Sequence, residues 1–188
     1  MADHKSLYFI AIIPPDDISE EIMSFKNDFA INYKSKRGLR ILPHITLQMP
    51  FFKGENEEPL MKEWLTEFAK TQFPLIIRLD GFGYFLNNRS DVVFVKLLEN
   101  PDLWSVHKEL MLILRNKGFT RQETKLNYNP HLTIAYRDLK RNQFLNAWSH
   151  YENRPYQRWF KVNEIHLLKH NGKQWQSLEK FRLTRTHR

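Results

Sequence analysis

The pattern Pro-His-x-Thr occurs twice in the chain, with its histidines at positions 44 and 131. Side chains alternate between the two faces of a β-strand, so in an extended conformation His44 and Thr46 share one face. His131 and Thr133 do the same in the second copy. The residues that face the other way are all aliphatic: Ile45, Leu47, Leu132 and Ile134. Each copy therefore predicts a strand with one apolar face and one face that carries an imidazole and a hydroxyl.

Two imidazoles and two hydroxyls that face one another can cleave a phosphodiester. The ordinary pKa of histidine is roughly 6.5, so a neutral imidazole can take a proton from water or a hydroxyl while a protonated one donates to the leaving oxygen. Exchanged roles run the reverse reaction. Each threonine hydroxyl can donate a hydrogen bond to a non-bridging phosphate oxygen. The predicted catalytic pair is His44 and His131, the predicted phosphate-binding pair is Thr46 and Thr133, and this chemistry needs neither a metal nor another cofactor.

Other interpretations of the two histidines stay open. A single histidine on a half-buried strand is usually structural, so a duplicated fold could keep the pattern for packing alone. The same groove could bind RNA or a nucleotide without catalysis, and binding would then survive replacement of either histidine. A metal-dependent hydrolase could use His44 and His131 as ligands, but no H-E-x-x-H motif or comparable carboxylate cluster accompanies them.

Composition limits the class of protein. A chain of 188 residues with 41% hydrophobic content fits one large domain or two closely packed lobes. Since cysteine is absent, disulfides and a cysteine nucleophile are excluded. A net charge of +8 favours an anionic partner such as RNA or nucleotides. The longest apolar run, at 7–13, is too short for a membrane span and lacks a signal-peptide cleavage pattern, so we expect a cytoplasmic protein without a membrane partner. The oligomeric state is not indicated.

Periodicity predicts the order strand, helix, strand, helix, strand in the first half of the chain. The strands are expected at 7–13, 39–49 and about 74–80. A helix from Asp16 to about Tyr33 buries a stripe formed by Ile18, Ile22, Phe25 and Phe29. The segment "EPLMKEWLTEFAK" (58–70) is expected to form the second helix.

The second half repeats this order. Strands are expected at 92–98, at 130–136 and from 159, followed by a hairpin that turns at 171–172 and ends near 183. The first helix of this half is capped by Asn100, has Pro101 at its first position and stops at Gly118. The second helix spans about 140–152.

Matched spacings indicate an internal duplication. The first strand begins 37 residues before His44 (at 7) and 39 residues before His131 (at 92). The next strand follows the histidines by 31 residues (Leu75) and 29 residues (Phe160). We therefore predict a single domain, 1–188, built from two β-α-β-α-β repeats at about 7–86 and 92–183. A pseudo-twofold axis between them would bring both motif strands to a shared central groove.

These motifs and their context resemble the 2H phosphoesterase superfamily, the group of the bacterial 2′-5′ RNA ligase (LigT-like) proteins, named for two H-x-[TS]-x motifs in tandem. The resemblance covers nearly the whole chain. It includes "FIAIIPP", "HITL", "LDGFGYFLNNRSDVVFVKL", "PHLTIAYR" and the C-terminal hairpin.

The resemblance implies a bilobal α+β fold in which two antiparallel-rich sheets surround the groove. It also implies metal-independent action on RNA ends or small nucleotides. The typical activities are hydrolysis of a 2′,3′-cyclic phosphate and reversible joining or cleavage of 2′-5′ linkages. The family's catalytic histidines correspond to His44 and His131, and its phosphate-binding hydroxyls to Thr46 and Thr133.

The segments that follow the two motifs depart from the family pattern. Many members read H-x-T-L-x-F-L-G at the first motif, whereas this chain reads "HITLQMPFF" and places Gln48 there. Many also carry arginine five residues after the second histidine. Here that position is Tyr136 and Arg137 follows, on the His131 face if the strand stays regular. We expect substrate contacts from Gln48, Tyr136 and Arg137.

Aromatic and basic residues supply further candidate contacts. Phe85 or Tyr84 is a candidate platform for stacking on a base. Basic residues precede both motif strands and predict positive charge around the groove, with Arg40 as a candidate contact, although a solvated basic face is the more ordinary interpretation. These residues are Lys36, Arg37, Arg40, Arg121 and Lys125. His107 lies on a helix near its apolar stripe and is assigned no role.

Overall fold

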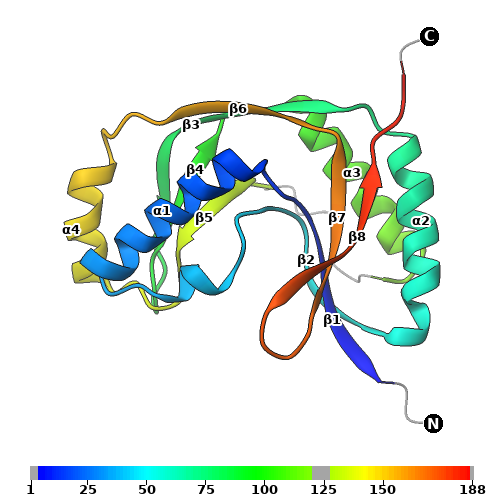
Figure 1. The fold of residues 1–188 in the computed structure, drawn as a ribbon, viewed down its shortest axis with the longest axis horizontal. Helices are drawn as coiled ribbons and strands as arrows, with labels where there is room; N and C mark the ends of the chain where they lie inside the picture. The colour runs from blue at the N-terminus through cyan, green and yellow to red at the C-terminus, as the bar shows by residue number, and fades with distance from the viewer. Residues whose placement is uncertain (1–3, 120–127, 187–188) are drawn as a thin grey trace.

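The computed structural model describes residues 4–119 and 128–186, which form eight strands and four α-helices (Figure 1). The strands are β1 (Lys5–Ile12), β2 (Ile45–Gly54), β3 (Leu75–Phe85), β4 (Val92–Leu97), β5 (His131–Ala135), β6 (Gln157–Val162), β7 (Glu164–His170) and β8 (Trp175–Arg182). The α-helices are α1 (Asp16–Asn32), α2 (Glu58–Lys70), α3 (Pro101–Asn116) and α4 (Arg141–Tyr151). Two short 3₁₀ turns are η1 (Arg37–Arg40) and η2 (Glu55–Glu57).

The strands join in one antiparallel sheet with the order β6-β3-β4-β5-β2-β1-β7-β8. The two motif strands are its central neighbours and meet at one residue pair, Ile45 opposite Leu132. The sheet thus consists of two four-stranded halves joined at the motif strands. The predicted α+β class with antiparallel strands is confirmed, with the difference that the two expected sheets are continuous.

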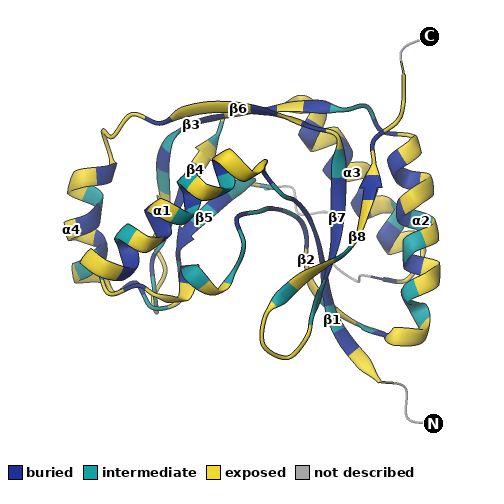
Figure 2. Cartoon of the chain, in the orientation of Figure 1, coloured by how far each residue is buried: buried dark blue, intermediate teal, exposed yellow. Residues whose placement is uncertain are grey.

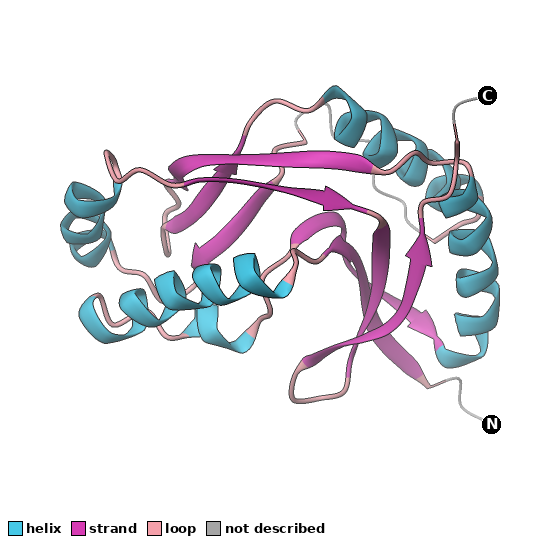
Figure 3. Cartoon of the chain, turned by 45° about the horizontal axis from the view of Figure 1, so that its top comes forward, coloured by secondary structure: helices cyan, strands magenta, loops and turns pink. Residues whose placement is uncertain are grey.

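Each half of the sheet has its own pair of helices. In Figure 1, α1 and α4 lie beside β3, β4 and β5, and α2 and α3 lie beside β1, β2, β7 and β8. The tilted view in Figure 3 shows the strands between these two groups of helices. Helix α1 follows β1 in the chain and packs on β5, and α3 follows β4 and packs on β2. Each motif strand is therefore covered by a helix whose preceding strand lies in the other half of the sheet.

The two predicted repeats exchange strands, so neither half of the sheet is built from one repeat alone. β3 pairs with β4, although they belong to different repeats, and β7 pairs with β1. A twofold axis that exchanges β2 with β5 and β1 with β4 exchanges β3 with β7. The matching of the Phe160 strand to the Leu75 strand is therefore wrong, because β6, which contains Phe160, lies outside β3 at the sheet edge. That the repeats arose by duplication stays a prediction.

The capping residues read from the sequence predict the ends of α3 correctly, whereas the predicted start of β2 is wrong. The Asn100 side chain accepts a hydrogen bond from the Leu103 backbone N–H at 2.9 Å, which confirms the cap of α3. Gly118 has a φ of +71°, as expected of a helix terminator. The strand predicted at 39–49 begins instead at Ile45, because residues 37–40 form η1, and it continues to Gly54.

The core fills the space between the helices and the sheet. In Figure 2 the helices are buried along the side that faces the strands and exposed on the outside. The predicted stripe of α1 is buried as expected, through Ile18, Ile22, Phe25 and Phe29. The same stripe also buries Lys26, a charged residue, which matters for the site below.

Candidate active site

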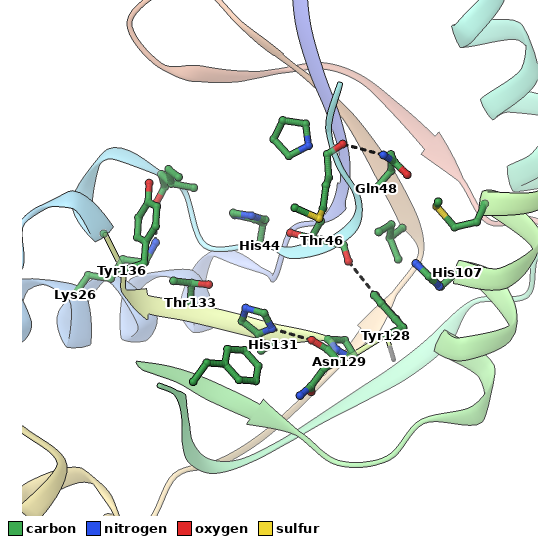
Figure 4. A pocket seen from close by; sticks show the side chains of 18 residues that line it. Lys26, His44, Thr46, Gln48, His107, Tyr128, Asn129, His131, Thr133 and Tyr136 are labelled. Atoms are coloured by element: carbon green, nitrogen blue, oxygen red, sulfur yellow. Dashed lines mark hydrogen bonds between the residues drawn. The ribbon is translucent and has the colours of Figure 1, made fainter. Parts of the chain in front are cut away.

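A cavity of about 670 Å³ opens where the two motif strands meet. Figure 4 shows that the four motif side chains lie in its middle. Lys26 and Tyr136 lie at one end, and Gln48, Tyr128 and His107 lie at the other. The cavity therefore has a centre that carries the sequence motifs and two ends of different composition.

The motif strands turn their polar residues into the cavity by simple alternation. Ile45 and Leu132 are completely buried, and the histidines and threonines beside them are partly accessible. Because the strands run antiparallel through the Ile45–Leu132 pair, one step along each strand brings His44 opposite Thr133 and Thr46 opposite His131. The two H-x-T units are thus related by the same local twofold as the strands.

Both imidazoles are oriented by equivalent hydrogen bonds. His44 Nδ1 lies 2.8 Å from the carbonyl oxygen of Leu42, and His131 Nδ1 lies 2.8 Å from that of Asn129. A carbonyl oxygen only accepts, so Nδ1 must carry the proton in each ring. The Nε2 atom of each histidine is then the atom that can accept or donate a proton in the cavity.

The surroundings of the two imidazoles differ. Burial, assisted by the positive charge of Lys26 and by His131 and opposed by the hydrogen bond to Leu42, lowers the pKa of His44 to about 4. Its ring centroid lies 5.0 Å from that of Phe9. Burial also lowers the pKa of His131, opposed by its hydrogen bond to Asn129. The His131 ring contacts two aromatic rings, with centroid distances of 5.2 Å to Phe85 and 4.8 Å to Phe94.

Lys26 contributes a buried ammonium group that the sequence motifs do not include. Its side chain is 2% exposed, and Nζ donates a hydrogen bond of 2.6 Å to the Ile41 carbonyl oxygen. Burial lowers its pKa to about 8. A signal for this residue exists in the sequence, since it lies four residues after Ile22 on the apolar face of α1, where a lysine is unexpected.

The turn η1, a few residues before His44, is held tightly against β5 and the residues that follow it. At Gly38 an added Cβ would lie 2.1 Å from the Ile134 carbonyl oxygen, so only glycine permits this approach. The Asp138 carboxylate accepts hydrogen bonds from the backbone N–H groups of Lys36 and Arg37 at 2.9 and 3.0 Å. These contacts fix the stretch that supplies the carbonyl groups for Lys26 and His44.

The opposite end of the cavity is neutral and largely aromatic. The rings of His107 and Tyr128 are stacked at 3.7 Å with an interplanar angle of 4°, and the Tyr128 hydroxyl donates to the Thr46 carbonyl oxygen at 2.9 Å. Burial lowers the pKa of His107 to about 4. Gln48 is buried and donates from Nε2 to the Met49 carbonyl oxygen at 3.0 Å. His107, to which the sequence assigns no role, thus lines the cavity.

Of the predicted substrate contacts, Gln48, Phe85 and Tyr136 line the cavity. Arg40 and Arg137 are exposed and do not line it. The regular strand that would place Arg137 on the His131 face ends at Ala135, and Arg137 has a φ of +65°, so that premise is wrong. Arg40 lies in η1 instead of the predicted strand.

The remaining candidates lie away from the cavity or are not described. The Tyr84 ring packs on Phe144 and Trp148 of α4, with centroid distances of 5.1 and 4.7 Å. Lys36 and Arg37 are exposed at the start of η1. Arg121 and Lys125 lie outside the described residues. Of the basic residues predicted to surround the groove, those that the structure describes are exposed side chains at η1, and Arg137 is exposed as well.

Two further features bear on the class of protein. Within residues 4–119 and 128–186, no three His, Asp or Glu side chains are grouped so that they could hold a metal ion. None of the helices in the described ranges has the length and apolar character that crossing a membrane requires.

Comparison with known proteins gives consistent matches. A protein-family model described as the 2′-5′ RNA ligase superfamily matches residues 14–174. The RNA 2′,3′-cyclic phosphodiesterase of Methanocaldococcus jannaschii is 34% identical over 132 residues, which cover 68% of this chain and 69% of the relative. The crystal structure of E. coli LigT complexed with 3′-AMP has a TM-score of 0.71 at 18% identity and covers 97% of this chain and 100% of LigT. A crystal structure of a Thermus thermophilus protein has a TM-score of 0.66 at 22% identity and covers 96% and 100% of the two chains.

The structural neighbours show a shared fold, and the family model together with the relative from M. jannaschii shows the family. Both H-x-T motifs fall within the matched region. The chain belongs to the 2′-5′ RNA ligase superfamily, a family of phosphoesterases.

Proposed function

We propose that the protein is a metal-independent phosphodiesterase that acts on 2′,3′-cyclic phosphate ends of RNA or nucleotides, or on 2′-5′ linkages. The observation that carries this proposal is the pair of imidazoles with identical Nδ1 hydrogen bonds, His44 to Leu42 and His131 to Asn129, across the central strand pair. Each presents Nε2 to the same cavity, so one can act as base while the other acts as acid.

Hydrolysis of a cyclic phosphate then proceeds by in-line displacement. The neutral imidazole removes a proton from water as the water oxygen bonds to phosphorus. The bond between phosphorus and one ribose oxygen breaks, and the protonated imidazole donates its proton to that oxygen. The product is a phosphate monoester, and each imidazole has exchanged its protonation state. With the ribose hydroxyl of a second chain in place of water, the same steps join the two chains, and in reverse they cleave that linkage and form the cyclic phosphate again.

The threonine hydroxyls stabilise the charge that develops on phosphate. Thr46 and Thr133 lie opposite His131 and His44, so a phosphate held between the imidazoles can accept a hydrogen bond from each hydroxyl. Such fixed donors act mainly when negative charge builds on the non-bridging oxygens in the transition state.

The electrostatic difference between the imidazoles assigns their roles in hydrolysis. The charge of Lys26 adds to burial in disfavouring protonated His44. His131 experiences burial without an equivalent lysine. In this proposal His44 is the base and His131 is the acid.

The named relatives support nucleotide or RNA substrates. The M. jannaschii relative is named as an RNA 2′,3′-cyclic phosphodiesterase, and LigT has been crystallised with 3′-AMP and with ATP. The net charge of +8 is consistent with a polyanionic substrate.

The test is incubation of the protein with a panel of 2′,3′-cyclic nucleotides and short oligonucleotides that end in this group. We expect His44→Ala and His131→Ala each to lower kcat by on the order of 10²- to 10⁴-fold, because each removes a proton-transfer group. His150→Ala, which changes an exposed histidine on α4, is the matched control and should keep wild-type activity. Unchanged turnover in both active-site variants would refute the mechanism. Tight binding without turnover in the wild type would instead identify a noncatalytic binding module, and loss of turnover on chelation would identify a metal enzyme.

A further inference from the structure

We propose that the ammonium group of Lys26 binds a phosphate oxygen of the substrate, at the end of the cavity next to Thr133 and Tyr136. The inference rests on the proposed phosphoesterase function and adds to it a cation from α1 that lies outside both motifs. Figure 4 shows Lys26 and Tyr136 together at this end of the cavity, with Thr133 between them and the two histidines.

The ammonium group lacks a full set of partners in the described structure. A lysine ammonium has three N–H donors, and the described hydrogen bond of Lys26 Nζ goes to the neutral Ile41 carbonyl oxygen. None of the ion pairs among residues 4–119 and 128–186 involves Lys26. A charge that is 2% exposed and has no counter-ion among the described residues costs free energy, which an anion entering the cavity would recover.

The charge of the cavity wall favours an anion over other ligands. Among the described residues that line the cavity, Lys26 is the only lysine or arginine, and aspartate and glutamate are absent. The exposed arginines near this end, Arg40 and Arg137, do not line it. Lys26 is therefore the one buried formal charge on the described wall, and the charges of Arg37, Arg40 and Arg137 also act on Tyr136 at this end, so the region is positive overall.

Lys26 also touches the segment that orients His44, so a structural role must be separated from anion binding. Consecutive carbonyl groups are involved: Ile41 accepts from Lys26 Nζ, and Leu42 lies within hydrogen-bond distance of His44 Nδ1. A lysine that only tethers this segment could be replaced by another hydrogen-bond donor. A lysine that binds phosphate requires its charge.

The experiment measures binding of inorganic phosphate by calorimetry to the wild type, Lys26→Met and Lys26→Gln. Methionine keeps the length of the side chain without charge or donor, and glutamine keeps an N–H donor without charge. Both are easier to bury than lysine, and thermal unfolding checks that each variant is folded. Lys36→Met is the matched control, because it removes one exposed positive charge from the start of η1.

We expect both Lys26 variants to bind phosphate about 10- to 100-fold more weakly than the wild type, the range for a lost hydrogen bond to a charged group. Lys36→Met should stay within about twofold, since exposed charges are screened. A wild type that does not bind phosphate overturns the inference, and so does wild-type affinity in either Lys26 variant, including the pattern in which glutamine alone preserves binding. Because no turnover is needed, the result is independent of the His44→Ala and His131→Ala assays. Lys26-dependent binding without hydrolysis would keep this inference and reject the proposed function.

Discussion

The two half-sites, His44 with Thr46 and His131 with Thr133, share one backbone frame and differ in what the neighbouring helices add to it. In each, an imidazole Nδ1 lies 2.8 Å from the carbonyl oxygen two residues earlier. In each, a helix side chain contacts the residue three positions before the histidine. That side chain is a lysine in one half-site and a histidine in the other.

The helix contributions differ in charge. Lys26 of α1 donates its ammonium N–H to Ile41, three residues before His44. His107 of α3 stacks its neutral ring on Tyr128, three residues before His131. The shared frame thus supplies two matched imidazole–hydroxyl pairs, and the unmatched helices give the cavity a charged end and a neutral end that carries the stacked His107 and Tyr128 rings. A nucleotide, with phosphate at one side and an apolar base at the other, would fit such a cavity in one orientation.

The largest expected effect tests the assignment of His44 as base and His131 as acid. A nucleoside 3′-(4-nitrophenyl phosphate) has a leaving group that departs as an anion, so it needs no acid, whereas its attacking hydroxyl must still lose a proton. The attacking group is a ribose hydroxyl, and the imidazole that protonates a ribose oxygen in hydrolysis deprotonates it in this direction, so His131 acts as base here and His44 faces the leaving group. With this substrate we expect His131→Ala to keep its loss of about 10²- to 10⁴-fold in kcat and His44→Ala to recover at least about tenfold of its loss. Steady-state kinetics on both substrates measures the difference. Recovery in His131→Ala instead would reverse the two roles.

The second prediction tests how far the symmetry extends to the hydroxyls. Thr46→Val and Thr133→Val remove one donor each at nearly constant volume. Because the two threonines occupy equivalent positions across the strand pair, each change should lower kcat by about 10²-fold and alter KM much less. Losses that differ by more than about tenfold would show that phosphate lies nearer to one half-site. The double variant shows whether the two effects are additive.

The third prediction concerns the unequal charge near the two imidazoles. Lys26 lowers the pKa of His44, so Lys26→Met should raise it. The base must be neutral to act, and the acidic limb of the kcat/KM profile should therefore move to higher pH in Lys26→Met. Lys36→Met should leave the limb in place. A limb that does not move would show that a group other than His44 controls it.

The sequence predicts the centre of this site well because the centre depends on short-range rules. Strand alternation is enough to place His44 with Thr46 and His131 with Thr133, and the matched spacing from the first strand of each half to its histidine predicts that the two pairs meet. Gln48, Phe85 and Tyr136 line the cavity, since they lie within a few residues of a motif or on the strand beside β4, and their contact with substrate stays a prediction.

The ends of the cavity depend on long-range packing that local patterns do not encode. Lys26 and His107 both lie on apolar stripes of helices, and only the exchange that packs α1 on β5 and α3 on β2 turns them toward the cavity. The same exchange explains why β7, and not the Phe160 strand, corresponds to β3. The expectation for Arg137 depended on a strand that ends two residues earlier, at Ala135.

The smallest expected effect concerns the stability of the neutral end. Burial lowers the pKa of His107 to about 4, below its ordinary value of roughly 6.5. Between these values the unfolded chain binds a proton that the folded chain does not, so the free energy of unfolding should fall as pH decreases through this window. The His107→Phe variant keeps a ring against Tyr128 but cannot titrate at this position. The free energy of unfolding of this variant should depend less steeply on pH than that of the wild type, by up to about 1.4 kcal/mol per pH unit.

His44→Phe should flatten the pH dependence similarly, because burial also lowers the pKa of His44 to about 4. Urea unfolding at several pH values between about 4 and 7 measures the slopes. An unchanged slope in His107→Phe would mean that folding does not lower the pKa of this imidazole, and at acidic pH the cavity would then carry positive charge at both ends.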